Sequence, residues 1–190
     1  MIRPIFLFSL PRSGSTLLQR IVAAHSLVHT ASEPWLLLPH FYAQRRRGTI
    51  AEYSHTAAVF NIRKFCDQLP NGIDDYRDAL RTFILDLYSR CCPPGKTHFL
   101  DKNPRYALIV DDLLATFPEG RFIFLWRNPL AVIGSNFEMF GHWPRSIYTN
   151  HVDLRGGLDR LINASRAHES RVFVMRYEDL LADLEACWES

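Results

Sequence analysis

Apolar residues follow two alternating patterns along this chain: short continuous runs, and longer stretches in which they recur every three or four positions. The clearest run is Arg121–Trp126, whose aromatic and β-branched side chains are typical of a buried strand in a parallel sheet. Another begins at Ile5 and breaks at Pro11. These runs predict strands at 5–10, 27–30, 97–100, 121–126 and 171–175.

The stretches between the strands have the helical period of about 3.6 residues. The first begins near Ser15, a good capping residue, and Pro34 and Pro129 stand at first-turn positions of two others, where proline is tolerated. A Gly- and Pro-containing loop is expected at 141–146. The expected helices are 15–26, 34–42, 50–70, 74–92, 106–117, 129–140, 153–168 and 177–188.

Strands that alternate with helices predict an α/β fold, a parallel β-sheet flanked by helices on both faces. In such sheets ligands bind outside the carboxyl ends of the strands. The loops 9–15, 101–105 and 127–129 all follow predicted strands. We therefore expect these three polar loops to converge on one edge of the sheet.

Length and charge limit the classes of protein that this chain can be. Its 190 residues, 47% of them hydrophobic, suffice for one core, so we expect a single domain over residues 1–190. The formal net charge of +2 is too small for a general polyanion binder, so we expect no nucleic-acid partner and only local anion recognition. The basic run 45–47 fits a solvated helix end, with an acidic-acceptor or nucleic-acid patch as the alternative.

Cysteine usage and hydropathy indicate the compartment. The cysteines form no C-x-x-C pair, which favours reduced thiols, and neither they nor the histidines have metal-ligand spacing; they are Cys66, Cys91, Cys92 and Cys187. No stretch approaches the roughly 20 apolar residues of a membrane span. The N-terminal run is short and leads directly into a polar loop, which argues against a signal peptide. We expect a cytoplasmic protein without a membrane span.

The loop between the first strand and the first helix has the residue types of an anion site. Unpaired N–H groups at a helix N-terminus point outward, and the helix dipole favours negative charge there. Gly14 permits close backbone approach, Arg12 adds charge, and hydroxyl donors come from Ser13, Ser15 and Thr16. Because G-x-x-x-x-G-K-[ST] is absent, this phosphate cradle is not a Walker A loop.

This loop resembles the 5′-phosphosulfate loop of sulfotransferases that use 3′-phosphoadenylyl sulfate (PAPS), in the Arg-containing form of the tyrosylprotein and many bacterial enzymes. The residues that carry the resemblance are Pro11-Arg12-Ser13-Gly14-Ser15-Thr16. The resemblance implies a P-loop-like version of the α/β fold and PAPS as sulfonate donor. It further implies that Arg12 stabilises the leaving group and that the donor is bound by Arg12, Ser13, Gly14, Ser15 and Thr16.

Two further stretches resemble nucleotide-binding elements of the same family. Arg127 follows a strand and Ser135 comes eight residues later on the next helix, which is similar to the family's 3′-phosphate motif. A guanidinium offers a forked donor to phosphate, and the hydroxyl can add another. Tyr177, directly after the last strand, matches a family element that helps to bind the nucleotide.

Two residues are candidates for the chemistry itself. The stretch after the third strand resembles the strand-end Lys motif of the family, and the compact charge of Lys102 suits a sulfonate or leaving oxygen. Glu33 occupies the place of the family's general base, and a carboxylate within reach of an acceptor hydroxyl can take its proton. The structural alternatives are a surface charge beside Asp101 for Lys102 and a helix-start carboxylate for Glu33.

The resemblance implies transfer of sulfonate from PAPS to a hydroxyl or amine acceptor, with 3′,5′-ADP as product and no metal. The acceptor is a small molecule, carbohydrate or protein, and its pocket is expected within 34–92 and 136–168. Two alternatives stay open: a P-loop nucleotide kinase or NTPase, which needs a loop Lys and a magnesium-binding carboxylate, and a catalytically silent nucleotide-binding module. Because family members normally continue past the last helix, we expect this chain to lack a C-terminal segment of the usual fold.

Overall fold

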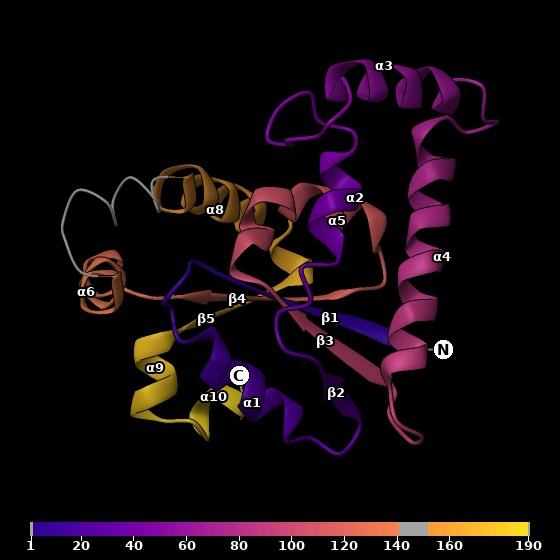
Figure 1. The fold of residues 1–190 in the computed structure, drawn as a ribbon. Coiled ribbons are helices and arrows are strands. Elements are labelled where there is room, and N and C mark those ends of the chain that lie inside the picture. Colours follow the sequence, from indigo (N-terminus) through magenta and orange to yellow (C-terminus); the bar gives the residue numbers. More distant parts are fainter. Residues whose placement is uncertain (1, 141–151, 190) are drawn as a thin grey trace.

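A five-stranded parallel sheet forms the centre of the computed structural model, which describes residues 2–140 and 152–189. The sheet has the spatial order β2-β3-β1-β4-β5 (Figure 1). Its strands are β1 (Arg3–Ser9), β2 (Val28–Thr30), β3 (His98–Lys102), β4 (Arg121–Trp126) and β5 (Val172–Arg176). Since β3 and β4 lie on opposite sides of β1, the chain order switches there, and such a switch point opens a crevice at the carboxyl ends of the strands.

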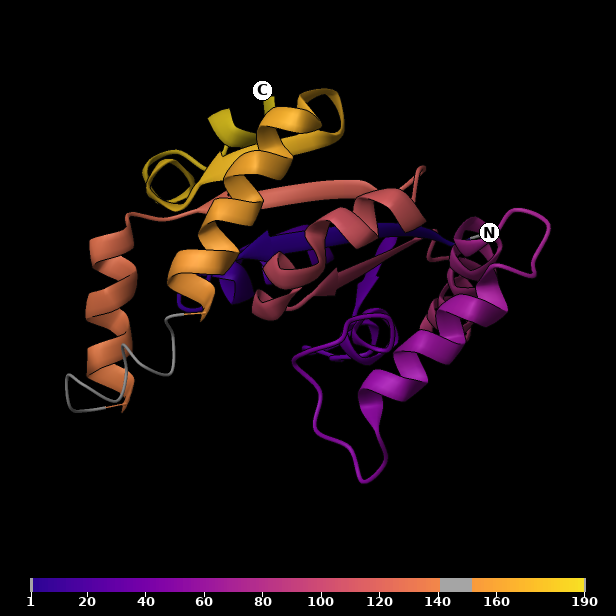
Figure 2. The ribbon, with the colours of Figure 1, turned by 90° about the horizontal axis from the view of Figure 1, so that it is seen from above.

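Helices cover both faces of the sheet, so the predicted α/β class is confirmed (Figures 1 and 2). One face carries α1 (Ser15–Ala23), α9 (Tyr177–Ala182) and α10 (Ala186–Glu189). The other carries α2 (Leu37–Tyr42), α4 (Ile73–Cys91), α5 (Val110–Thr116) and α8 (Leu158–Ala167). Helix α3 (His55–Cys66) packs on α4, and α6 (Pro129–Phe140) stands beyond the end of β4, on the opposite side of the molecule from α4 in Figure 2.

Burial on both faces explains why the strands read as continuous apolar runs rather than as alternating ones. On the face of α4, α5 and α8, aromatic rings pack together, with 5.5 Å between the ring centroids of Phe6 and Phe122 and 5.0 Å between those of Phe8 and Phe124. On the other face Leu7 packs among the core residues that include Leu18 of α1. Each such side chain stabilises the fold by about 1.5–3 kcal/mol, so the sheet is a firm base for the loops at its edge.

Two predicted helices are wrong at positions where the backbone leaves helical geometry. The helix expected from 34 begins only at Leu37, because Trp35 has a left-handed φ of 54° that no α-helix accommodates, so Glu33 lies in a loop. The helix expected over 177–188 is broken at Asp183, which is extended at φ −153°. The carboxylate of Asp183 accepts the N–H of Ala186 at 2.9 Å and thereby starts α10.

Strand β3 is longer than predicted, because Asp101 and Lys102 pair with Phe6 and Leu7 of β1 instead of forming a loop. Helix α1 starts at Ser15 as predicted, but its cap is the left-handed Gly14 rather than a serine side chain, and the helix ends at Ala23. Helix α3 is shorter than the predicted stretch 50–70, whereas α4 matches the predicted stretch 74–92 with an offset of one residue.

Two other helices begin with irregular turns. The stretch predicted as 106–117 opens with a 3₁₀-helix, η1 (Pro104–Ile109), before α5, and the stretch 153–168 opens with a π-helical turn, η2 (Val152–Gly157), before α8. The loop predicted at 141–146 lies outside the described residues. Within the described ranges, no helix is both long and apolar enough to cross a membrane.

Candidate active site

The loop between β1 and α1 turns sharply at the carboxyl edge of the sheet. Arg12 and Gly14 both have left-handed backbone angles, with φ of 65° and 85°. Glycine adopts this conformation without strain, whereas at Arg12 it costs on the order of 1 kcal/mol and must be held by neighbouring contacts. The N–H groups of Ser15 and Thr16 belong to the first turn of α1 and have no acceptor within the helix. The loop therefore offers backbone donors to an anion at the positive end of the helix dipole.

Gly14 is required for a second reason, which is the ring of Tyr177 from α9. A Cβ placed on Gly14 would lie 2.2 Å from Cε2 of that ring, well inside van der Waals contact. The loop and the start of α9, 163 residues apart in the sequence, therefore meet face to face only because residue 14 has no side chain. The predicted residues Gly14 and Tyr177 are thus brought together.

Arg127, directly after β4, joins the same group. Its Nη1 donates to the carbonyl of Arg12 at 2.7 Å, and its guanidinium carbon lies 4.6 Å from the centroid of the Tyr177 ring. This hydrogen bond is one of the contacts that hold Arg12 in its strained conformation. Arg12 in turn donates through Nε to Oγ of Ser135 on α6 at 3.2 Å. Two guanidinium groups are therefore gathered beside the anion loop.

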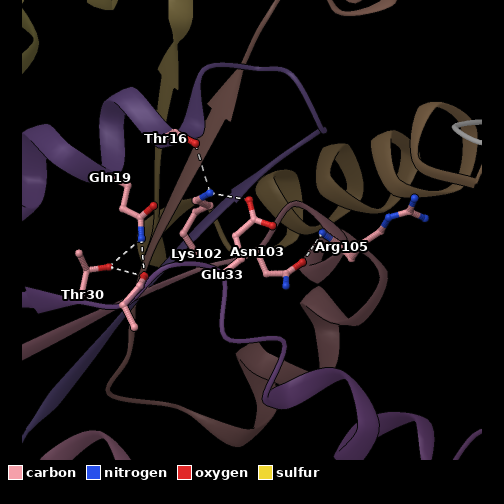
Figure 3. A network of polar contacts seen from close by, with 8 residues as sticks. Thr16, Gln19, Thr30, Glu33, Lys102, Asn103 and Arg105 are labelled. Carbon is pink, nitrogen blue, oxygen red and sulfur yellow. Dashed lines mark hydrogen bonds and ion pairs between the residues drawn. The ribbon is translucent and has the colours of Figure 1, made fainter. Parts of the chain in front are cut away.

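A second group forms around Lys102 at the last position of β3 (Figure 3). Its side chain is only 3% exposed, and Nζ donates to Oε1 of Glu33 at 2.7 Å and to Oγ1 of Thr16 at 3.4 Å. The interpretation of Lys102 as a surface charge beside Asp101 is therefore wrong. A single ammonium group thus links the anion loop to the candidate base, which lies 69 residues away in the sequence.

Asp101 faces the other side of the sheet, since neighbouring residues of a strand point in opposite directions. It is fully buried and accepts hydrogen bonds through Oδ2 from the hydroxyls of Tyr88 at 2.5 Å and Tyr106 at 3.0 Å. Burial raises the pKa of Asp101 to about 6, although both hydrogen bonds act in the opposite direction. The cluster ties α4 and η1 to the end of β3 and so fixes the strand that carries Lys102.

A polar network that the sequence analysis missed holds the segment leading to Glu33 (Figure 3). Gln19 of α1 is buried, and its Nε2 donates to Oγ1 of Thr30 at 2.8 Å and to the carbonyl of Ala31 at 2.7 Å. The hydroxyl of Thr30 donates to the carbonyl of Leu100 in β3 at 2.7 Å. The sequence feature that could have indicated this network is the amide side chain of Gln19, next to Leu18 on the apolar face of the helix, because a buried amide needs hydrogen-bond partners.

Glu178 was also missed, and it fastens α9 to the loop after β4. Its Oε1 accepts the N–H of Asn128 at 2.9 Å, and this hydrogen bond is the main cause that lowers the pKa of Glu178. The contact brings the start of α9 beside the end of β4, which explains how Tyr177 comes under Arg127.

The site fits an anionic ligand such as a phosphate group. Within residues 2–140 and 152–189, the hydroxyl of Ser13 and the side-chain amide of Asn136, next to Ser135, are buried without a hydrogen-bond partner. Buried polar groups are normally paired, so these two have unused capacity beside the arginines. Together with the glycine cradle and the free N–H groups, they match the chemistry of phosphate oxygens. No group of three or more His, Cys, Asp or Glu side chains suited to a metal ion occurs among the described residues.

Among the described residues, apolar pockets occur both away from this chemistry and near the segments that carry it. A pocket of about 460 Å³ opens at the starts of the strands, lined by residues such as Ile5 and His98, away from the charged loops. Another of about 500 Å³ is lined by Trp35 and Arg105, which lie near Glu33 and Lys102 in the sequence. This second pocket is therefore a candidate site for a small ligand.

Comparison with known proteins gives a consistent assignment. A family model described as the sulfotransferase family matches residues 4–189. Nodulation protein NoeE of Sinorhizobium fredii is 34% identical over 137 residues, which cover 72% of this chain and 31% of NoeE. The omega-hydroxy-beta-dihydromenaquinone-9 sulfotransferase Stf3 of Mycobacterium bovis is 28% identical over 133 residues, 61% of this chain and 32% of Stf3. The chain spans about a third of the length of these two curated relatives.

Solved structures share the fold at low sequence identity. The sulfotransferase domain of the Synechococcus olefin synthase superposes with a TM-score of 0.65 at 21% identity, covering 98% of this chain and 70% of that domain. A sulfotransferase from Alicyclobacillus acidocaldarius gives a TM-score of 0.58 at 14% identity, covering 96% of this chain and 76% of the other. These likenesses show that the architecture of the sheet and its helices is shared.

Proposed function

The chain belongs to the sulfotransferase family, and from this premise we propose that it transfers the sulfonate group of PAPS to a hydroxyl or amine acceptor. When bound, PAPS supplies the activated sulfonate, and the residues of this chain bind it, orient it and handle the proton. The observation that carries the proposal is Lys102, whose ammonium group touches both the anion loop at Thr16 and the carboxylate of Glu33.

The arginine side of the site would hold the donor. Arg12, the hydroxyl of Ser13 and the N–H groups at Gly14, Ser15 and Thr16 would bind the 5′-phosphosulfate, and Arg12 would also stabilise the leaving group. Arg127 and Ser135 would read the 3′-phosphate, with the ring of Tyr177 beside them. The contacts of Arg12 with both Arg127 and Ser135 support this proposal, because the residues that we assign to the 5′ and 3′ ends of the nucleotide are direct neighbours.

The lysine side of the site would carry out the transfer. The bond between sulfur and the phosphate oxygen breaks, and a new bond forms between sulfur and the acceptor oxygen. Lys102 would stabilise charge on the leaving oxygen, and Glu33 would take the acceptor proton. The hydrogen bond of 2.7 Å between these two side chains supports a reacting centre beside the pair, because it brings the candidate base and the candidate cation to one place.

We further propose that no metal is needed. A sulfonate carries less charge than a terminal phosphate, and the cations of Arg12 and Lys102 could neutralise the charge that develops on the leaving oxygen. A nucleotide kinase would need a carboxylate after β4, where this chain has Arg127. A cytoplasmic location is also proposed, and the free thiols of Cys66, Cys91 and Cys92 support it.

Isothermal titration with 3′,5′-ADP and with ATP–Mg²⁺, followed by a transfer assay with PAPS and a phenol, tests the proposal. We expect micromolar or tighter binding of 3′,5′-ADP, no comparable binding of ATP–Mg²⁺, and turnover that Arg12→Ala abolishes. Preference for ATP–Mg²⁺ would favour a kinase. Binding of 3′,5′-ADP with no turnover on any acceptor would favour the silent module.

A further inference from the structure

The apolar pocket of about 500 Å³ adjoins the segment that carries the candidate base. Trp35 is two residues from Glu33, and a chain of two residues spans at most about 7 Å. Arg105 also lines the pocket and is three residues from Lys102, and its backbone N–H donates to Oδ1 of Asn103 at 2.8 Å (Figure 3). The pocket is thus lined by residues of the two short segments, 33–35 and 102–105, that also carry Glu33 and Lys102.

We propose that this pocket binds an alkyl chain or aromatic ring of the acceptor and thereby presents the acceptor hydroxyl to Glu33. This inference rests on the proposed function, because it names the acceptor class of the same site. The volume lies within the roughly 300–1,000 Å³ usual for small-molecule pockets. Its lining is largely hydrophobic, with the side chains of Trp35, Leu38, Pro39, Ile50 and Leu108.

The wall next to Glu33 is built around an exposed aromatic side chain. Trp35 has a left-handed φ of 54° and is still 50% exposed. A bulky residue in this conformation is strained, and strain of this kind is concentrated at binding sites, where the surrounding structure maintains it. The position of Trp35 therefore points to a role on the surface of the pocket rather than in the core.

The opposite wall is a loop that is fastened in place. A Cβ on Gly48 would lie 2.6 Å from the ring of Tyr42, so the loop runs directly against that ring. Arg45 anchors the loop through an ion pair with Asp112 and a hydrogen bond of 2.8 Å to the carbonyl of Leu108. Ile50 then stands fully exposed at the mouth of the pocket. Because this loop is already held in place, ligand binding would lose less conformational entropy in ordering it.

The charges of the pocket argue against an acidic peptide or a glycan as its occupant. Arg105 lines the pocket, but its Nη2 is paired with the carboxylate of Asp153 at 3.2 Å, so its charge is compensated. The other polar side-chain groups of the described lining residues are the indole N–H of Trp35 and the hydroxyls of Tyr42 and Thr49. A sugar needs a denser set of hydrogen-bonding partners, because each buried hydroxyl without one loses free energy.

Titration of 4-alkylphenols from methyl to pentyl, in the presence of 3′,5′-ADP, tests this inference. In the parent protein the affinity should rise about fourfold for each methylene that the pocket buries. Ile50→Ser removes an exposed side chain that the fold does not need, and it should reduce the rise to less than twofold per methylene. Leu181→Ser, at a 60% exposed position of α9 on the other face of the sheet, is the matched control and should behave like the parent.

An affinity that does not depend on chain length, or an equal dependence in the Ile50→Ser variant, would overturn the inference. So would stronger binding of a tyrosine peptide or of an alkyl-free phenyl glucoside than of 4-pentylphenol. Binding of 3′,5′-ADP is measured separately: if it is intact while the chain-length effect is missing, the acceptor class is wrong and the proposed function stands. If 3′,5′-ADP does not bind, the proposed function itself fails.

Discussion

The two groups of charged residues in the site are held in opposite ways. Arg12 is exposed and Arg127 partly exposed, and both are kept in place by loop contacts, a carbonyl, a serine hydroxyl and a tyrosine ring. The side chain of Lys102 is 3% exposed at the end of a central strand, and its ion partner is Glu33. An exposed cation can be removed at small cost to the fold, whereas a buried one depends on its partner.

This difference indicates a division of labour. Open loops suit groups that meet a ligand from solvent and follow its phosphates. A buried strand end suits groups whose charges act at short range in low dielectric, where electrostatic stabilisation is strongest. We therefore expect substitutions in the arginine group to weaken nucleotide binding, with an added loss of turnover at Arg12, and substitutions in the lysine group to lower turnover without weakening binding.

A large loss of turnover is expected for Lys102→Met, which keeps the length of the side chain and removes its charge. Turnover should fall by about 10²–10³-fold, because the leaving oxygen loses its nearest buried cation, while affinity for 3′,5′-ADP should change little. Steady-state kinetics and calorimetry measure both quantities. Lys64→Met, at an exposed position on α3, is the control. Turnover within tenfold of the parent would show that the buried lysine is structural.

Gly14→Ala should act on the arginine side and abolish measurable binding of 3′,5′-ADP, since its Cβ would displace the ring of Tyr177. Gly95→Ala is a matched control, with φ of 87° against 85° but no atom within 4 Å of its Cβ. It should share the backbone strain, about 1 kcal/mol of stability, without any loss of binding. Equal losses of affinity in both variants would mean that Tyr177 does not shape the loop.

Arg127→Ala should weaken binding of 3′,5′-ADP at least tenfold and leave 5′-AMP almost unaffected. The reason is that a hydrogen bond to a charged group contributes roughly 1.5–3 kcal/mol, and only the first ligand has a 3′-phosphate. Arg121→Ala, at the exposed start of the same strand, is the control. Equal losses for the two nucleotides would indicate that Arg127 holds the loop through Arg12 rather than the phosphate.

The smallest effect on catalysis is expected for Asp101→Asn, although it should change how stability depends on pH. Burial raises the pKa of Asp101 in the folded protein to about 6, above the unfolded value near 3.8, so the folded state binds the proton more tightly. The tighter proton binding stabilises the folded state relative to the unfolded state by about 1–3 kcal/mol. This stabilisation is fully present below about pH 4 and is lost as the pH rises through 6.

Urea denaturation at several pH values should therefore show parent stability falling between pH 4 and 6 relative to the Asp101→Asn variant, with binding of 3′,5′-ADP unchanged. An unchanged difference between the two proteins across this range would mean that Asp101 is ionised at an ordinary pKa.

The arginine group could be anticipated from the sequence, because strand ends and the helix start fix where Arg12, Gly14 and Arg127 lie. The meeting of Gly14 with Tyr177 could not, since it depends on a ring packing onto the loop from 163 residues away. Local patterns place backbone segments, but they do not determine which distant side chains touch.

The lysine group was less accessible to sequence reasoning. Glu33 was expected at a helix start, and only the left-handed backbone of Trp35 releases it into a loop, a conformation that no residue preference indicates. Lys102 was expected in a loop. It lies in β3 because that strand is extended by pairing with β1, almost 100 residues earlier, and local sequence does not indicate such a distant pairing. The pairing of Glu33 with Lys102 followed from these two tertiary effects.

The central claim, that Glu33 acts on the acceptor and Lys102 on the donor, is tested most directly by turnover on phenols of different acidity, measured in EDTA. Glu33→Gln keeps the shape and removes the base, so turnover should fall about 10²–10⁴-fold on the least acidic phenol. That loss should shrink steadily as the phenol becomes more acidic, whereas the loss for Lys102→Met should be the same across the series. A Glu33→Gln enzyme as fast as the parent on the least acidic phenol, or equal acidity dependence in both variants, would contradict the account.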